Sequence, residues 1–155
     1  MNQKLRMIVA TGAVLVMSLP ACAAEKKIAK SALPPAVSKT ANEQSSGAVV
    51  KGYSEDREGG MLEYEVEMMV HGHSRDVTIA PDGKLLEVEE QVALNGLSAE
   101  VQSALKSKAG KGIITKVESL TKRGRLVAYE AQVRTAGRHS EIQVGPQGQA
   151  LDHEE

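Results

Sequence analysis

The chain has 155 residues, 41% of them hydrophobic, and a formal net charge of −1, which suits one ordinary domain or two very small ones. It contains no Trp, no Phe and only three Tyr, so its core must be built from aliphatic side chains. The balanced charge and the scarcity of aromatic side chains argue against a nucleic-acid-binding protein, which would need a basic surface with rings that stack on bases.

Residues 1–23 have the pattern of a secretory signal peptide, because Lys4 and Arg6 precede an apolar run that ends in small residues. The run is too short to span a bilayer comfortably, so we expect no membrane span in the mature chain. This predicts a periplasmic or secreted protein. Cys22, the only cysteine, leaves the alternative of a lipoprotein that is cleaved before Cys22 and anchored there.

The rest of the chain contains two copies of one unit, offset by about 65 residues. Glycine, proline and tyrosine recur in register: Gly47 with Gly112, Gly59 with Gly124, Tyr64 with Tyr129, Gly72 with Gly137, Pro81 with Pro146, and Gly83 with Gly148. We therefore divide the mature chain into a linker, a first repeat, a second repeat and a tail, at 24–31, 32–92, 93–152 and 153–155.

Each repeat is predicted to begin with a helix. In the first repeat, Pro34 and Pro35 suit a first helical turn, where a missing N–H costs little. In the second, Ser98 is a candidate N-cap, and Val101 and Leu105 fall on one helical face.

Strands are predicted to follow each helix. Segments 47–55 and 112–121 are rich in β-branched residues, and 62–70 alternates between apolar and polar residues. Hairpin turns are expected at Gly72 and Gly137.

The turn at 81–84 is expected to lead into a fourth strand over 84–90, with Leu86 and Val88 facing inward. In the second repeat only a stub over 149–153 remains for this strand. The expected fold is therefore α+β: a tandem repeat of a helix and a four-stranded antiparallel meander, each sheet covered by its helix on one face and open on the other.

The order of these motifs resembles the PepSY-like, or β-lactamase-inhibitor-like, family of exported bacterial proteins. The resemblance is carried by Leu-Pro-Pro-Ala-Val at 33–37, Tyr-Glu-Val-Glu at 64–67 and Pro-Asp-Gly-Lys at 81–84. It implies a BLIP-like build and a non-enzymatic module that binds, or inhibits, an envelope protein such as a peptidase through its open sheet face. It assigns no role to particular residues.

The candidate interaction surface is a stripe of carboxylates on the open face, made of Glu63, Glu65, Glu67, Glu87 and Glu89. Alternate residues of a strand share a face and lie less than about 7 Å apart. Such a row would attract a cationic partner and speed its association. Two other interpretations are a face kept soluble by its charge, and an acidic first half that complements the more basic second half.

His71 and His73, with two methionines close by, suggest a copper site in an oxidising compartment, but Gly72 between them favours a simple polar turn. The serines and the single Cys22 lack the setting of a catalytic nucleophile, so we expect no enzyme and no cofactor. The function predicted from the sequence is protein binding, and the alternative is an envelope protein that binds a metal or a small ligand. The sequence leaves the oligomeric state open.

Overall fold

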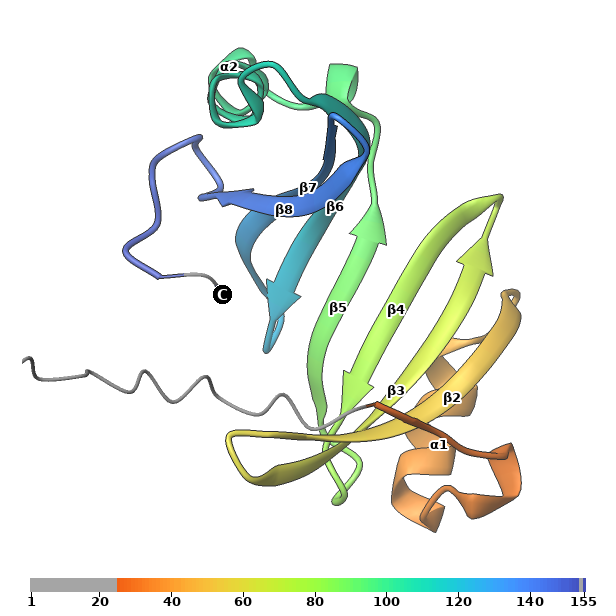
Figure 1. The fold of residues 1–155 in the computed structure, drawn as a ribbon. Coiled ribbons are helices and arrows are strands. Elements are labelled where there is room, and N and C mark those ends of the chain that lie inside the picture. The colour runs from red at the N-terminus through yellow and green to blue at the C-terminus, as the bar shows by residue number, and fades with distance from the viewer. Residues whose placement is uncertain (1–24, 154) are drawn as a thin grey trace, which may run out of the picture.

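The computed structural model describes residues 25–153 and 155. Within this part of the chain, eight strands form one antiparallel sheet whose strand order follows the sequence, from β1 to β8 (Figure 1). The predicted α+β class is therefore confirmed. The expected signal peptide and Cys22 lie outside the described residues.

The first half of the chain forms β1 (Lys26–Lys27), η1 (Lys30–Ala32), α1 (Pro35–Gln44), β2 (Val49–Glu58), β3 (Met61–Val70), β4 (His73–Ile79) and β5 (Leu85–Gln91). The second half forms η2 (Leu94–Gly96), α2 (Ala99–Ala109), β6 (Ile113–Lys122), β7 (Arg125–Thr135) and β8 (Arg138–Val144). Strand β5 pairs with β6, so both halves share a single sheet.

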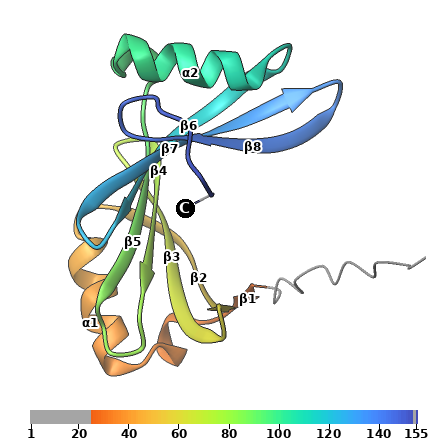
Figure 2. The ribbon, with the colours of Figure 1, turned by 90° about the vertical axis from the view of Figure 1, so that its left-hand side faces the viewer.

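The sheet bends between its two halves, and both helices lie on its outer side (Figure 2). The C-terminal residue lies on the inner side of the bend. We call the side of the sheet that faces away from α1 and α2 the inner face. It corresponds to the open face predicted from the alternation of residues in the sequence.

Each helix is held to the sheet by its own core, which is aliphatic except for Tyr64 in the first half. In the first half the core comprises Leu33, Val37, Ala41, Tyr64, Val66, Met68, Val77 and Ile79, and in the second half Val101, Leu105, Val117, Ala131 and Val144. Burial of one such aliphatic side chain stabilises a fold by about 1.5–3 kcal/mol. Two small cores of this kind replace the aromatic core that the composition excludes.

The helix starts agree with the sequence analysis. Pro35 is the first residue of α1, and the Ser98 hydroxyl accepts a hydrogen bond of 3.3 Å from the Val101 N–H at the start of α2. Val101 and Leu105 are both buried, which confirms the apolar face predicted for α2.

The segment predicted as a linker contributes a strand. Lys26 and Lys27 form β1 and pair with Glu55 and Ser54 at the edge of β2. An exposed ion pair of 2.7 Å joins the Lys26 Nζ to the Glu55 Oε1. Part of the expected linker is therefore an edge strand.

The predicted strand stub at 149–153 does not form. β8 is the last strand, and the chain turns after it, with the Gly145 N–H bonded to the Gln149 carbonyl over 2.8 Å. The corresponding strand of the first half, β5, begins with Leu85 and Leu86, whereas an exposed Ala150 and Leu151 stand in their places at the offset of 65 residues. With less apolar surface to bury, this short segment gains little from joining the sheet.

The predicted inward position of Leu86 is also wrong. Leu85 and Val88 pack against the first core, while Leu86 lines a pocket at the end of the inner face. The strand register shifts between Thr78 and Ile79 where β4 pairs with β5. Such an irregularity shifts by one residue the alternation of side chains between the two faces of the strand. The sequence of β5 contains no signal that predicts it.

The recurrence of glycine at positions 83 and 148, the same point of the two halves, is explained by packing. Gly83 and Gly148 both have positive φ angles, of 87° and 81°, in turns that touch the helices. A Cβ on Gly83 would lie 2.9 Å from the Ala36 carbonyl oxygen of α1, and one on Gly148 would lie 2.7 Å from the Glu100 oxygen of α2. Only glycine lets these turns approach the helix backbone so closely.

We predict that Gly83→Ala and Gly148→Ala each lower the free energy of unfolding by about 2–3 kcal/mol, because each adds a steric clash to left-handed backbone strain. Gly72→Ala is the matched control, since its φ is 88° but a Cβ there would meet nothing within 4 Å. Its loss should be about 1 kcal/mol, the strain alone. Urea unfolding measures all three variants, and equal losses would contradict the role of helix contact.

Candidate functional site

The strand register collects carboxylates on the inner face. Directly opposite residues of neighbouring strands share a face, and their Cβ atoms lie about 4.5–5.5 Å apart. Glu67 of β3 lies opposite Asp76 of β4, which lies opposite Glu89 of β5. In the adjacent row, Thr78 lies between Glu65 and Glu87. The carboxylates therefore form a patch over three strands rather than a single stripe.

The five glutamates predicted from the sequence lie on this patch. Glu63, Glu65 and Glu67 come from β3, and Glu87 and Glu89 come from β5. All five are half-buried, so the face is less open to water than the alternation suggested. Their approach across β4 is something the sequence did not show.

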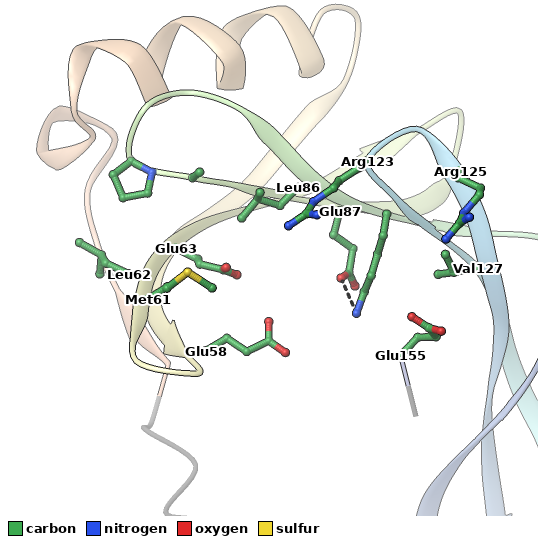
Figure 3. Close-up of a pocket in the computed structure, with 13 residues that line it drawn as sticks. Glu58, Met61, Leu62, Glu63, Leu86, Glu87, Arg123, Arg125, Val127 and Glu155 are labelled. Atoms are coloured by element: carbon green, nitrogen blue, oxygen red, sulfur yellow. Dashed lines mark ion pairs between the residues drawn. The ribbon is translucent and has the colours of Figure 1, made fainter. Parts of the chain in front are cut away.

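At one end of the inner face, the patch meets a pocket of about 700 Å³ (Figure 3). Glu63 and Glu87 of the patch line it, together with residues from the tips of the β2–β3 and β6–β7 hairpins. In the wall of the pocket, where Glu87 of β5 lies opposite Lys122 of β6, the Lys122 Nζ lies 3.5 Å from the Glu87 Oε2. This ion pair joins an acidic residue of the first half to a basic residue of the second, as the charge balance of the two halves suggested.

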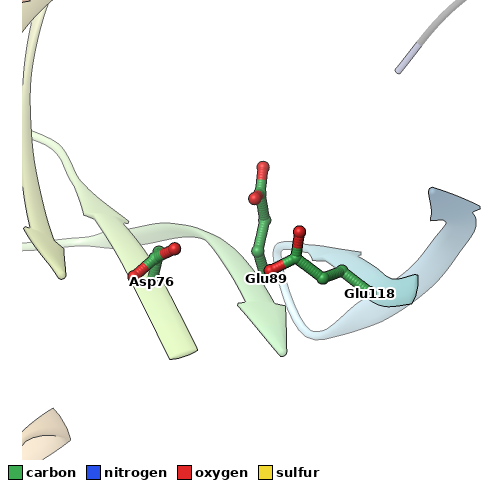
Figure 4. A group of neighbouring side chains, drawn as sticks. All are labelled: Asp76, Glu89 and Glu118. Atoms are coloured by element: carbon green, nitrogen blue, oxygen red, sulfur yellow. The ribbon is translucent and has the colours of Figure 1, made fainter. Parts of the chain in front are cut away.

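Near the middle of the face, Asp76, Glu89 and Glu118 bring carboxylate oxygens within 4.8 Å of one another (Figure 4). We call these three residues the carboxylate triad. They come from β4, β5 and β6, so the triad spans the boundary between the two halves. Glu118 is only 3% exposed, and its Oε1 lies 2.6 Å from the Lys116 Nζ and 3.3 Å from the Ser74 hydroxyl that donates to it.

The sequence analysis missed Asp76 and Glu118. Asp76 is preceded by Arg75 and lies in a strand with one acidic residue, so no acidic repeat marks it. Glu118 belongs to the more basic half and reaches the triad only because β6 pairs with β5. The one available signal was the alternation within β4, which places Asp76 on the face opposite Val77.

Burial and crowding raise the pKa values of several of these carboxyls. Burial raises the pKa of Glu89 to about 8, with further contributions from Glu87 and Glu118. Burial raises the pKa of Glu65 to about 7, aided by the charge of Asp76. The pKa of Asp76 is raised mainly by its own burial. The face thus holds protons near neutral pH that an exposed carboxyl would release.

Carboxylate oxygens in such a patch can bind a basic side chain or a hard cation. Charge-assisted hydrogen bonds from Lys or Arg to carboxylates are among the strongest in proteins. Ca²⁺ takes about 6–8 oxygen ligands, so the triad reaches only the lower end of this range even if each of its carboxylates binds with both oxygens. Lys116 already directs its ammonium group at Glu118, which shows the kind of charge that this part of the face accepts.

The histidines suggested as a copper site lie elsewhere. His71 and His73 are exposed at the β3–β4 hairpin, where His71 has a φ of 51° and Gly72 a φ of 88°. Among the described residues, the carboxylate triad brings three potential metal ligands close together, and it includes neither histidine. The turn interpretation explains their positions.

The inner face becomes mixed in charge towards β8. Glu130, Gln132 and Arg134 of β7 lie opposite Gln143, Glu141 and His139 of β8. The Gln143 side chain donates a hydrogen bond of 2.8 Å to the Glu130 carboxylate. The excess of negative charge is therefore concentrated on β3 to β6.

No family model and no curated protein matches this chain. Several solved structures, in contrast, have a fold similar to that of this chain. A candidate periplasmic protein from Bacteroides eggerthii has 17% identity and a TM-score of 0.62, covering 76% of this chain and 85% of its own. A BLIP-like protein from Bacteroides fragilis has 17% identity and a TM-score of 0.56, covering 76% and 83%. A DUF2874 family protein from Bacteroides ovatus has 18% identity and a TM-score of 0.59, covering 77% and 85%.

These likenesses define the fold, which is BLIP-like. Membership of the PepSY-like family stays a prediction from the sequence motifs. Among the described helices, none has the length and apolar character needed to cross a membrane.

We predict that stability rises as the pH falls from 8.5 to 5.5. For a carboxyl with a higher pKa in the folded chain than in the unfolded chain, stability is fully present below the unfolded pKa and is lost as the pH rises from that value through the folded pKa. Stability is therefore lost between the ordinary glutamate pKa of 4.5 and the pKa in the folded chain, which is about 7 for Glu65 and about 8 for Glu89. Thermal unfolding at stepped pH measures the trend.

The variants Glu65→Gln and Glu89→Gln should each be more stable than the wild type at pH 8.5 and should flatten this dependence. We expect about 1 kcal/mol for each, because both side chains stay partly exposed and water screens the repulsion. Glu43→Gln on the exposed surface of α1 is the control and should follow the wild type. A wild-type stability that increases between pH 5.5 and 8.5 would contradict the raised pKa values.

Proposed function

We propose that the protein is a non-enzymatic periplasmic module that captures a basic segment of an envelope protein on its inner face. The observation that carries this proposal is the crowding of half-buried carboxylates around the triad. Their mutual repulsion is relieved when a cation approaches, so a positively charged partner would bind where the fold leaves its negative charge least compensated.

The size of the patch favours a protein segment over a single ion. Glu63 to Glu67 extend over about 13 Å of β3 at about 3.3 Å per residue. The neighbouring strands add Asp76 and Glu89 on the same face. One metal ion would engage the triad alone, whereas a basic segment could contact the whole patch. The bend of the sheet presents this patch as a concave surface (Figure 2).

The periplasmic location is supported by two observations. The first is the signal-peptide pattern of residues 1–23. The second is the fold shared with candidate periplasmic proteins. Anchoring at Cys22 is the alternative form of the same location, and mass spectrometry of the mature N-terminus distinguishes the two. Inhibition of the partner, for instance a peptidase, is included in the proposal because an occupied basic segment is no longer available to other molecules.

A capped peptide of alternating lysine and glycine tests the binding chemistry by calorimetry. We expect binding to wild type that weakens by at least about threefold in a Glu65→Gln/Glu89→Gln double variant and in high salt. Binding should also weaken from pH 8.5 to 5.5, because the raised pKa values protonate the face. Glu43→Gln should bind like the wild type.

Equal affinities for the wild type and the double variant would contradict the proposal. Titration with Cu²⁺, Zn²⁺ and Ca²⁺ examines the alternative predicted from the sequence, a metal-binding envelope protein. Tight metal binding without peptide binding would favour that alternative. Capture from an envelope extract, compared between the wild type and the double variant, then identifies the natural partner.

A further inference from the structure

The pocket at the end of the inner face has oppositely charged sides. Glu58 and Glu63 lie on one side and Arg125 lies on the other, while the Arg123 guanidinium group extends from the basic side to the middle of the pocket, beside Leu86 (Figure 3). The Glu87–Lys122 ion pair lies between them. The pocket volume, about 700 Å³, is within the usual range of about 300–1,000 Å³ for ligand sites.

Apolar side chains line the middle of the pocket, at Leu86, and also its acidic side, at Met61 and Leu62 (Figure 3). Leu62, Leu86 and Val127 line the pocket and are half-buried, and Met61 at the hairpin tip is 66% exposed. An exposed methionine is costly to keep in water, and its flexible thioether adapts to many shapes. The register shift that moves Leu86 out of the core supplies part of this apolar surface.

The acidic side has more negative charge than its surroundings balance. The pKa of Glu63 is raised by burial first, then by the charges of Glu58, Glu87 and Asp56, while Lys122 lowers it. Lys122 is already paired with Glu87. A second cation at this side would therefore meet carboxylates that repel one another.

The basic side likewise carries positive charge that no ion pair among the described residues neutralises. Arg123 and Arg125 flank the tip of the β6–β7 hairpin, and both are exposed. Within the described residues neither guanidinium group has an ion pair or a side-chain hydrogen bond. Glu155, whose N–H donates a hydrogen bond of 2.8 Å to the Gln143 Oε1, also lines this side, so a carboxylate fits there (Figure 3).

We propose that this pocket binds a peptide segment in which an apolar side chain lies between a basic and an acidic residue. The basic residue would lie against Glu58 and Glu63, and the carboxylate would lie against Arg123 and Arg125, which can bind it bidentately. This inference rests on the proposed function, since it specifies the partner segment that reaches the end of the inner face.

Three capped pentapeptides test the inference by calorimetry and by amide chemical shifts of the labelled protein. The mixed probe is Lys-Gly-Leu-Gly-Glu, the cationic probe has Lys at both ends, and the anionic probe has Glu at both ends. We expect the mixed probe to bind the wild type about tenfold more tightly than either uniform probe, because it satisfies both sides of the pocket. Its shifts should map to both hairpin tips.

Variants of exposed residues separate the two sides. Arg123→Gln/Arg125→Gln should remove the advantage of the mixed probe and should not weaken binding of the cationic probe, because the two arginines repel it. Arg138→Gln at the start of β8, outside the pocket, is the matched control and should behave like the wild type. Circular dichroism confirms that each variant remains folded.

The outcomes distinguish this inference from the proposed function. Equal binding of the mixed and cationic probes to the wild type, or an undiminished advantage in Arg123→Gln/Arg125→Gln, would overturn the pocket inference and leave the inner-face proposal standing. Failure of both the cationic probe and the longer lysine–glycine peptide would instead overturn the proposed function.

Discussion

The pairing of β5 with β6 is the interaction on which the rest of the structure depends. It runs from Glu87 opposite Lys122 to Gln91 opposite Glu118, and it joins two small helix-covered sheets into one. A unit of about 65 residues buries little surface by itself. The pair also creates the sites, because the carboxylate triad takes Glu89 and Glu118 from its two sides. The charged pocket likewise lies where the two halves meet.

The inner face makes the folded protein less stable than it could be. A patch of half-buried carboxylates repels itself at neutral pH, and the two aliphatic cores on the outer side must offset that repulsion. Natural proteins depart from the most stable arrangement mainly where a site requires it. The outer side, with turns packed on helix backbone and a side-chain cap at the start of α2, shows no comparable conflict among the described residues. The contrast between the two sides directs attention to the inner face.

Much of the fold follows from local sequence signals. Ser98 and Pro35 mark the helix starts, and the alternation around Tyr64 and Val66 separates the two sheet faces. The sequence could not reveal the triad, because Glu118 approaches Asp76 only through a strand pairing set by long-range contacts. Register shifts are equally hidden from local patterns, which is why the inward position predicted for Leu86 is wrong.

The missing last strand has a consequence for how this molecule behaves in a crowded compartment. Among the described residues no strand covers the outer edge of β8, and an open edge invites other chains to add to the sheet. Arg138 and Glu141 place charges along this edge, and the Lys108 ammonium donates a hydrogen bond of 2.8 Å to the Gln143 carbonyl. Charge and a hydrogen-bonded carbonyl thus oppose edge-to-edge aggregation at β8, whose outer edge no strand of the described residues covers.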